Sequence, residues 1–297
     1  MYKKAFLFNG IGSDPNKNFE VLSEPMKKKA LGYLKETLEK FNLDIVINKN
    51  SLYDKSVAEC IFSSICDRVV FESFIERGIT PDIGVGYSLG LVTCSSCFGS
   101  FPFDLSYESM YNIKKIMENL ENNNIKMGMG SIIGLDLEAV NKLISSAGEQ
   151  DNVSVGSVNS KIFIMITGME DSVVKILKAA DEEGALKTIK LGVGVCFHTD
   201  ALSKFCNEHI NFFTEDKFCD LRYPIISTVD QRIITDKSDL CNENILSVIR
   251  QMRWDLTIDK LEKSGVTEFY DMSANGSVKK FTRCTKKSTI YTYTDLL

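Results

Sequence analysis

One serine of the sequence lies in a context that favours nucleophilic catalysis. Residues 86–90 read GYSLG, a G-x-S-x-G motif that follows the apolar residues 83–85 and precedes a segment compatible with a helix. A nucleophile elbow needs this context, because the serine sits on a tight strand-to-helix turn and the helix N-terminus stabilises negative charge. The alternative is a glycine-rich turn with an incidental serine, which the position of the motif disfavours. The motif therefore predicts Ser88 as a nucleophile.

A serine nucleophile needs a general base, and the chain has two histidines. His198 directly follows the strand-like run GVGVCF, so a strand end would present it to a cleft. His209 lies between an acid and apolar residues, which is typical of a surface or packing residue. We therefore predict His198 as the general base.

A glycine loop, NGIGSD at residues 9–14, follows the strand expected at residues 4–8. One interpretation is a nucleotide-binding loop, but the third glycine of G-x-G-x-x-G is missing and the sequence has no GKS or GKT. The other is a loop whose backbone N–H joins the N–H after Ser88 in an oxyanion hole. The second interpretation fits the elbow better.

Composition and charge exclude several classes of protein. The 297 residues are 44% hydrophobic with a net charge of −5, so charge predicts neither a nucleic-acid nor a membrane partner. The uncharged run 83–103 is interrupted by Gly, Ser and Pro, and the apolar start is too short for a signal peptide. Nine scattered cysteines indicate reduced thiols and a cytoplasmic protein. Cys94 and Cys97 form a CxxC without a second pair, so buried helix thiols are favoured over a redox or zinc site, and we expect no metal.

The chain pattern predicts an α/β fold with an insert. Helical spacing covers residues 25–41 and 58–77, Gly78 is expected to end the second helix, and a strand at 83–87 follows. From about residue 128 to 195 the pattern becomes β-α-β-β-α-β, which is typical of a ferredoxin-like unit. We therefore expect an α/β body of residues 1–126 and 196–297, interrupted by an α+β subdomain of residues 127–195.

Five segments together resemble the malonyl-CoA:acyl-carrier-protein transacylase family, including stand-alone polyketide synthase acyltransferases and related acyl hydrolases. They are FNGIGSD at 8–14, GYSLG at 86–90, VNS at 158–160, FHTDAL at 197–202 and MRWDLTI at 252–258. The resemblance implies an α/β-hydrolase-like large domain with an inserted ferredoxin-like subdomain. It also implies no permanent cofactor, because the substrate itself carries phosphopantetheine on acyl carrier protein or CoA. We expect acyl carrier protein as partner, acyl-CoA as a further donor, and a monomer.

The resemblance also assigns roles to residues. Ser88 would accept the acyl group, and His198 would be oriented by a main-chain carbonyl from the stretch Arg250–Arg253. The N–H groups of Ile11 and Leu89 would bind the oxyanion, and Asn159 would help to hold the loop. The substrate pocket implied by the family comprises Ile113, Tyr87, Glu59, Asn159 and Phe197.

Departures from the family pattern bear on the substrate. Tyr87, Leu91 and Glu59 replace the usual histidine, glutamate and glutamine. Ile113 stands where malonyl-transferring members have an arginine that pairs with the substrate carboxylate, and no arginine lies between Arg77 and Arg222. A shifted register would place Lys114 or Lys115 there, but a point charge does not reproduce the bidentate pair. An uncharged acyl group is therefore the expected substrate.

The leading hypothesis is a serine enzyme that forms an acyl-enzyme from acyl thioesters in polyketide or fatty-acid biosynthesis. Because the residues around the serine differ, we favour hydrolytic release of the acyl group slightly over its transfer. The alternatives are acyl or malonyl transfer from CoA to carrier protein, and a non-catalytic protein that docks carrier proteins. An unrelated α/β-hydrolase esterase would need more strands before the elbow and an acid between serine and histidine.

Overall fold

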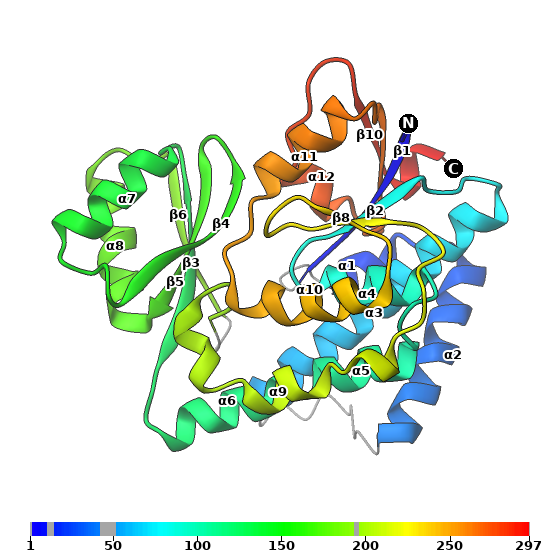
Figure 1. Cartoon of the computed structure of the whole chain (residues 1–297), viewed down its shortest axis with the longest axis horizontal. Helices are drawn as coiled ribbons and strands as arrows, with labels where there is room; N and C mark the ends of the chain where they lie inside the picture. Colours follow the sequence, from blue (N-terminus) through cyan, green and yellow to red (C-terminus); the bar gives the residue numbers. More distant parts are fainter. Residues whose placement is uncertain (1, 11–14, 42–51, 193–195, 297) are drawn as a thin grey trace.

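A computed structural model of the chain describes residues 2–10, 15–41, 52–192 and 196–296. Its larger sheet has six strands in the order β10-β9-β1-β2-β7-β8, of which only the β7–β8 pair is antiparallel (Figure 1). The strands are β1 (Lys4–Phe8), β2 (Ile83–Gly86), β7 (Ile225–Ile226), β8 (Ile233–Ile234), β9 (Glu268–Asp271) and β10 (Thr289–Tyr291).

Helices cover both faces of this sheet, because the apolar side chains of β1 alternate between the two faces. Phe6 and Phe8 belong to a buried core with the helices on one face, while Ala5 and Leu7 pack on the other face with Trp254. Both sets are fully buried, which is usual for a parallel strand at the centre of a sheet. The helices of the first face are α1 (Pro15–Glu20), α2 (Glu24–Phe41), α3 (Leu52–Glu76), α4 (Gly90–Cys97), α5 (Phe103–Tyr111), α9 (Asn207–Phe212) and α10 (Lys237–Ile249). Those of the second are α11 (Trp254–Lys263) and α12 (Ser277–Phe281).

The segment after α6 (Ile113–Asn122) forms a separate four-stranded antiparallel sheet, on the left in Figure 1. Its elements are β3 (Met127–Ile133), α7 (Leu137–Ser146), β4 (Val153–Ser160), β5 (Phe163–Met169), α8 (Glu170–Glu182) and β6 (Lys187–Leu191). The strand order β4-β5-β3-β6 and the β-α-β-β-α-β element order are those of a ferredoxin-like unit. The predicted α/β class with a ferredoxin-like subdomain is therefore confirmed, while the exact domain boundaries at 126/127 and 195/196 stay a prediction.

The two faces of the small sheet have different neighbours. One face packs against α7 and α8 through residues such as Ile132, Ile164 and Ile166. The other contributes Met127, Met129 and Met165 to a core that also contains residues of α6 and the segment around Phe197. Main-chain hydrogen bonds add to this contact: Val158 N–H donates to Met252 O at 3.0 Å and Met252 N–H to Gly156 O at 2.9 Å. The small sheet is thus fixed to the segment that leads into α11.

Most local predictions from the sequence are confirmed. Gly78 has a φ of 76°, as expected after a helix. The helix before it is longer than predicted, because α3 begins at Leu52, six residues before the predicted start at 58. All nine cysteines are free thiols, with Cys94 and Cys97 buried on α4. Within the described ranges, the longer helices are too polar to cross a lipid bilayer.

Candidate active site

Ser88 lies on the turn between β2 and α4, and its backbone is in the left-handed region with a φ of 55°. This turn requires glycine at two positions, because neighbouring backbone atoms leave no room for a Cβ there. A Cβ on Gly86 would lie 2.1 Å from the amide nitrogen of Leu91, and one on Gly90 would lie 2.4 Å from Phe8 O. The G-x-S-x-G spacing is therefore a steric requirement of the strand–turn–helix unit, which disfavours the interpretation of an incidental serine.

His198 is held at the C-terminal end of α10 by two hydrogen bonds. Its N–H donates to Val248 O at 2.7 Å, and its ring Nδ1 lies 2.6 Å from Ser247 O. The last carbonyls of a helix have no partner within the helix, so α10 presents them to an incoming donor. The predicted stretch Arg250–Arg253 therefore holds only the weaker of two main-chain contacts, and the main orienting carbonyl lies three residues before it. Ser247 supplies it, and the main chain of Arg250 adds a smaller contribution.

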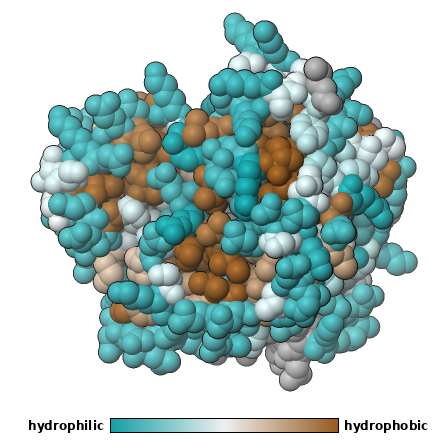
Figure 2. Space-filling view, viewed as in Figure 1, coloured by the Kyte–Doolittle hydropathy of each residue, from teal (hydrophilic) through white to brown (hydrophobic). Residues whose placement is uncertain are grey.

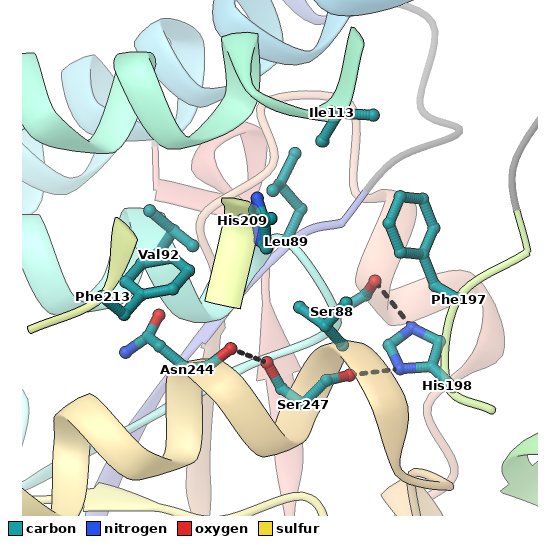
Figure 3. A pocket seen from close by; sticks show the side chains of 11 residues that line it. Ser88, Leu89, Val92, Ile113, Phe197, His198, His209, Phe213, Asn244 and Ser247 are labelled. Atoms are coloured by element: carbon teal, nitrogen blue, oxygen red, sulfur yellow. Dashed lines mark hydrogen bonds between the residues drawn. The ribbon is translucent and has the colours of Figure 1, made fainter. Parts of the chain in front are cut away.

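The two side chains meet across the cavity (Figure 3). Ser88 Oγ lies 2.9 Å from His198 Nε2. A carbonyl oxygen only accepts, so His198 Nδ1 carries a proton toward Ser247 and leaves the Nε2 lone pair free to accept the serine proton. Burial lowers the pKa of His198 to about 4, against smaller raising contributions from the main chain of Ser247 and Arg250. The imidazole is therefore neutral at neutral pH, which is the form that a general base requires.

Of the two predicted oxyanion donors, Leu89 and Ile11, the structure describes Leu89. Leu89 directly precedes α4, where helix amides lack intrahelical partners, and it lines the cavity. The loop after β1 reaches the elbow, because a Cβ on Gly10 would lie 2.6 Å from Tyr87 O and 3.0 Å from Ser88 Cβ. Ile11 itself lies outside the described residues. The close approach at Gly10 is consistent with the predicted contribution of this loop.

A cavity of about 30 Å³ adjoins the Ser88–His198 pair. It is lined by Ser88, Leu89, Val92, Ile113, Phe197, His198, His209, Phe213, Asn244, Ser247 and Val248. Ile113, the first residue of α6, and Phe197 are two of the predicted pocket residues, and both line this cavity. No lysine or arginine is among these lining residues. On the face shown in Figure 1, apolar residues gather near the centre of the molecule (Figure 2).

Three residues predicted for the substrate pocket do not line this cavity. The Tyr87 hydroxyl donates to Asn159 Oδ1 at 3.0 Å, and the Tyr87 ring packs against Trp254 on the α11 side of the sheet. Asn159 is buried and also accepts from Ser157 Oγ at 2.6 Å. The hydrogen bond between Tyr87 and Asn159 therefore links the elbow to β4 of the small sheet. Glu59 is an exposed residue of α3 and is not among the residues that line this cavity.

The two lysines considered as substitutes for the missing arginine are also absent from the cavity lining. Lys115 is exposed and forms an ion pair with Glu208 at 3.2 Å. Lys114 is half-buried on α6. Of residues 113–115, Ile113 is thus the one that lines the cavity.

Several lining residues were missed by sequence reasoning. His209 was expected at the surface or in packing. It is only 3% exposed, packs edge-on against Phe213 with ring centroids 5.2 Å apart, and lines the cavity. Asn244 and Val248 come from α10, and their sequence context is that of an ordinary helix. The rarity of histidine was the one signal that could have drawn attention to His209.

Comparisons with known proteins agree with this architecture. No protein-family model matches the sequence. The malonyl CoA-acyl carrier protein transacylase of Bacillus subtilis is 29% identical, over 95% of this chain and 92% of its own length.

Solved structures of the same kind share the fold. The malonyl CoA-acyl carrier protein transacylase of Coxiella burnetii superposes with a TM-score of 0.82 at 20% identity, covering 98% of this chain and 94% of that one. A malonyl-transacylase solved in complex with a type II polyketide synthase acyl-carrier protein gives 0.81 at 19% identity, covering 98% and 95%. These matches confirm that the chain resembles the malonyl-CoA:acyl-carrier-protein transacylase family over nearly its whole length.

Proposed function

We propose that the chain is an acyltransferase-fold enzyme that forms an acyl-enzyme on Ser88 from acyl thioesters. The observation that carries this proposal is the 2.9 Å approach of Ser88 Oγ to His198 Nε2 beside a largely apolar cavity. The relatives named above are transacylases that use acyl carrier protein, which supports acyl carrier protein and CoA as the carriers of the thioester. Because those relatives include a polyketide synthase component, we place the reaction in fatty-acid or polyketide biosynthesis, and we propose a cytoplasmic location.

The proposed reaction has two half-reactions. His198 Nε2 takes the proton of Ser88 as Oγ attacks the thioester carbonyl. The N–H groups of Leu89 and of the loop after Gly10 stabilise the oxyanion. The carbon–sulfur bond then breaks, the pantetheine thiolate takes the proton from His198, and the acyl group remains as an ester on Ser88. A second nucleophile, a thiol or water, reverses these steps and frees the serine.

We propose an uncharged, short acyl group as the substrate. A malonyl carboxylate beside Ile113 would be buried without a cationic partner, which costs several kcal/mol. The cavity volume of about 30 Å³ is close to the space of two water molecules, which favours short acyl chains. Acetyl and its small homologues meet both conditions.

Hydrolytic release of the acyl group stays a prediction from the sequence. It is supported by the missing arginine and by the changes at Tyr87 and Leu91 beside Ser88. To test the fate of the acyl group, a carrier protein loaded with acetyl is mixed with catalytic enzyme and an excess of a second, unloaded carrier. Free acetate as the main product supports hydrolysis, whereas loading of the second carrier shows transfer.

Formation of the acyl-enzyme is tested by intact-protein mass spectrometry after incubation with acetyl-pantetheine. We expect the mass of one acetyl group on the wild-type chain and none on Ser88→Ala. A non-catalytic docking protein would gain no mass but would still bind carrier protein. That result would replace the enzyme proposal with the docking alternative.

A further inference from the structure

Two side chains in the cavity have buried polar atoms that form no hydrogen bond with the part of the chain that the structure describes. Nδ1 of His209 and Oδ1 of Asn244 are both inaccessible to solvent and unpaired. Both residues line the cavity, with exposed fractions of 3% and 1%. Buried polar atoms usually have a partner, so an unpaired pair in one small cavity points to a ligand.

The orientation of the Asn244 amide is fixed by its own helix. Nδ2 donates to Leu240 O at 2.9 Å on α10, which leaves Oδ1 as the free end of the side chain. In Figure 3, His209 and Asn244 lie with Phe213 away from His198, so they are separate from the groups that move the serine proton. The free oxygen accepts hydrogen bonds and does not donate them.

His209 offers the complementary group. Burial lowers its pKa to about 4, so the ring is neutral at neutral pH and has one N–H donor and one acceptor nitrogen. It packs against the apolar ring of Phe213, and the described residues that line the cavity include no carboxylate to stabilise a protonated imidazole. With His209 in the tautomer that has its proton on Nδ1, α9 contributes an uncharged donor and α10 an uncharged acceptor to the residues that line the cavity.

We propose that the preferred acyl group carries a hydroxyl, which donates to Asn244 Oδ1 and accepts from the ring N–H of His209. This inference rests on the proposed formation of an acyl-enzyme and names the class of its substrate. Among alkyl, keto, carboxylate and hydroxyl substituents on a short acyl group, only the hydroxyl satisfies both residues. An alkyl group leaves both polar atoms unpaired, a ketone has no hydrogen for Asn244, and a carboxylate places negative charge against its oxygen.

The test uses two pairs of pantetheine thioesters in which a hydroxyl replaces a methyl of the same size. These are glycolyl against propionyl, and 3-hydroxypropionyl against butyryl. The rate of mass gain at Ser88 is measured for each donor at limiting concentration. We expect at least one hydroxylated donor to react about tenfold faster than its methyl partner, since sites built to bind a hydroxyl reject analogues that lack it. Equal rates in both pairs would overturn the inference and would indicate that water alone satisfies the two residues.

Variants of His209 and Asn244 test whether these two residues cause the preference for a hydroxylated acyl group. Asn244→Leu and His209→Phe keep size and remove the acceptor and the donor, so each should reduce the hydroxyl preference to within about twofold. Thr257→Val is a matched control, because it removes a buried hydroxyl on α11 that does not line the cavity. It should retain the wild-type ratio. A full preference in both cavity variants would contradict the inference, and the wild-type ratio remains a test if a variant does not fold.

Loading with acetyl-pantetheine distinguishes a failure of the hydroxyl inference from a failure of the proposed function. If acetyl loads Ser88 but the paired donors do not differ, the proposed function stands and the hydroxyl inference is wrong. If no donor loads Ser88, the proposed function is wrong and the inference falls with it.

Discussion

Ser88 and His198 both have left-handed backbones, with φ values of 55° and 64°, and their side chains meet at 2.9 Å although 110 residues separate them in the sequence. A non-glycine residue in this region costs about 1–3 kcal/mol and persists only where the surroundings impose it. Here the surroundings are the glycine-flanked turn at Ser88 and the carbonyls of α10 at His198. Both strained residues are the ones proposed to carry the chemistry.

Two substitutions at Ser88 separate chemistry from strain. Ser88→Ala and Ser88→Gly both remove the hydroxyl, so neither should form an acyl-enzyme. Glycine adopts positive φ without strain, so Ser88→Gly should be about 1 kcal/mol more stable to unfolding than Ser88→Ala. Denaturation by urea measures the difference. A more stable alanine variant would show that this turn is not strained.

His198 should control the pH dependence of acylation. Its neutral form is required, and burial lowers its pKa from 6.5 to about 4. The acylation rate should therefore stay constant from pH 8 down to about pH 5 and fall below that value. An inflection near pH 6.5 would show that the imidazole is not desolvated as the structure indicates.

The lowered pKa of His198 also makes the stability of the folded state depend on pH, so the pH experiment needs a control for unfolding. Between pH 6.5 and about 4 the unfolded chain binds a proton at His198 that the folded chain does not, so this residue makes the folded state less stable as pH falls through that window. Circular dichroism at each pH distinguishes loss of fold from loss of base. His198→Ala should slow acylation by on the order of 10² or more at every pH.

Ile113→Arg should change the substrate preference. The side chain lies at the cavity wall, where a guanidinium would pair with a carboxylate. Such a pair contributes about 1.5–3 kcal/mol, so malonyl loading should rise by roughly one to two decades relative to acetyl loading. Parallel mass spectrometry with malonyl-CoA and acetyl-CoA gives the ratio. If the ratio stays at the wild-type value while acetyl still loads, Ile113 does not face the distal end of the acyl group.

The glycine after Ser88 should be intolerant of any side chain. A Cβ on Gly90 would lie 2.4 Å from Phe8 O and 2.6 Å from Asn9 O, both rigid backbone atoms. Gly90→Ala should therefore destabilise the fold by about 1–3 kcal/mol and reduce acylation. Gly32→Ala on α2 is the control, because nothing lies within 4 Å of its Cβ. It should stabilise the fold by about 0.5–1 kcal/mol through helix propensity.

Features set by neighbouring residues could be predicted from the sequence. The elbow around Ser88 depends on a short apolar strand, two glycines and a helix, all within 15 contiguous residues from Ile83 to Cys97. The β-α-β-β-α-β order depends equally on local alternation of apolar residues. The absence of arginine near Ile113 was also visible in the sequence, because no arginine lies between Arg77 and Arg222.

Only the tertiary structure decided which distant groups meet. Ser247 orients His198 because the end of α10 packs beside it, and every helix of the chain ends in similar carbonyls. The packing of α9 and α10 likewise places His209 and Asn244 in the same cavity as Ser88. Glu59 and Tyr87 do not line that cavity. The sequence determined the nucleophile and its turn, because local sterics form that turn. The packing of segments far apart in the chain determined the base's partner and the chemistry of the acyl cavity.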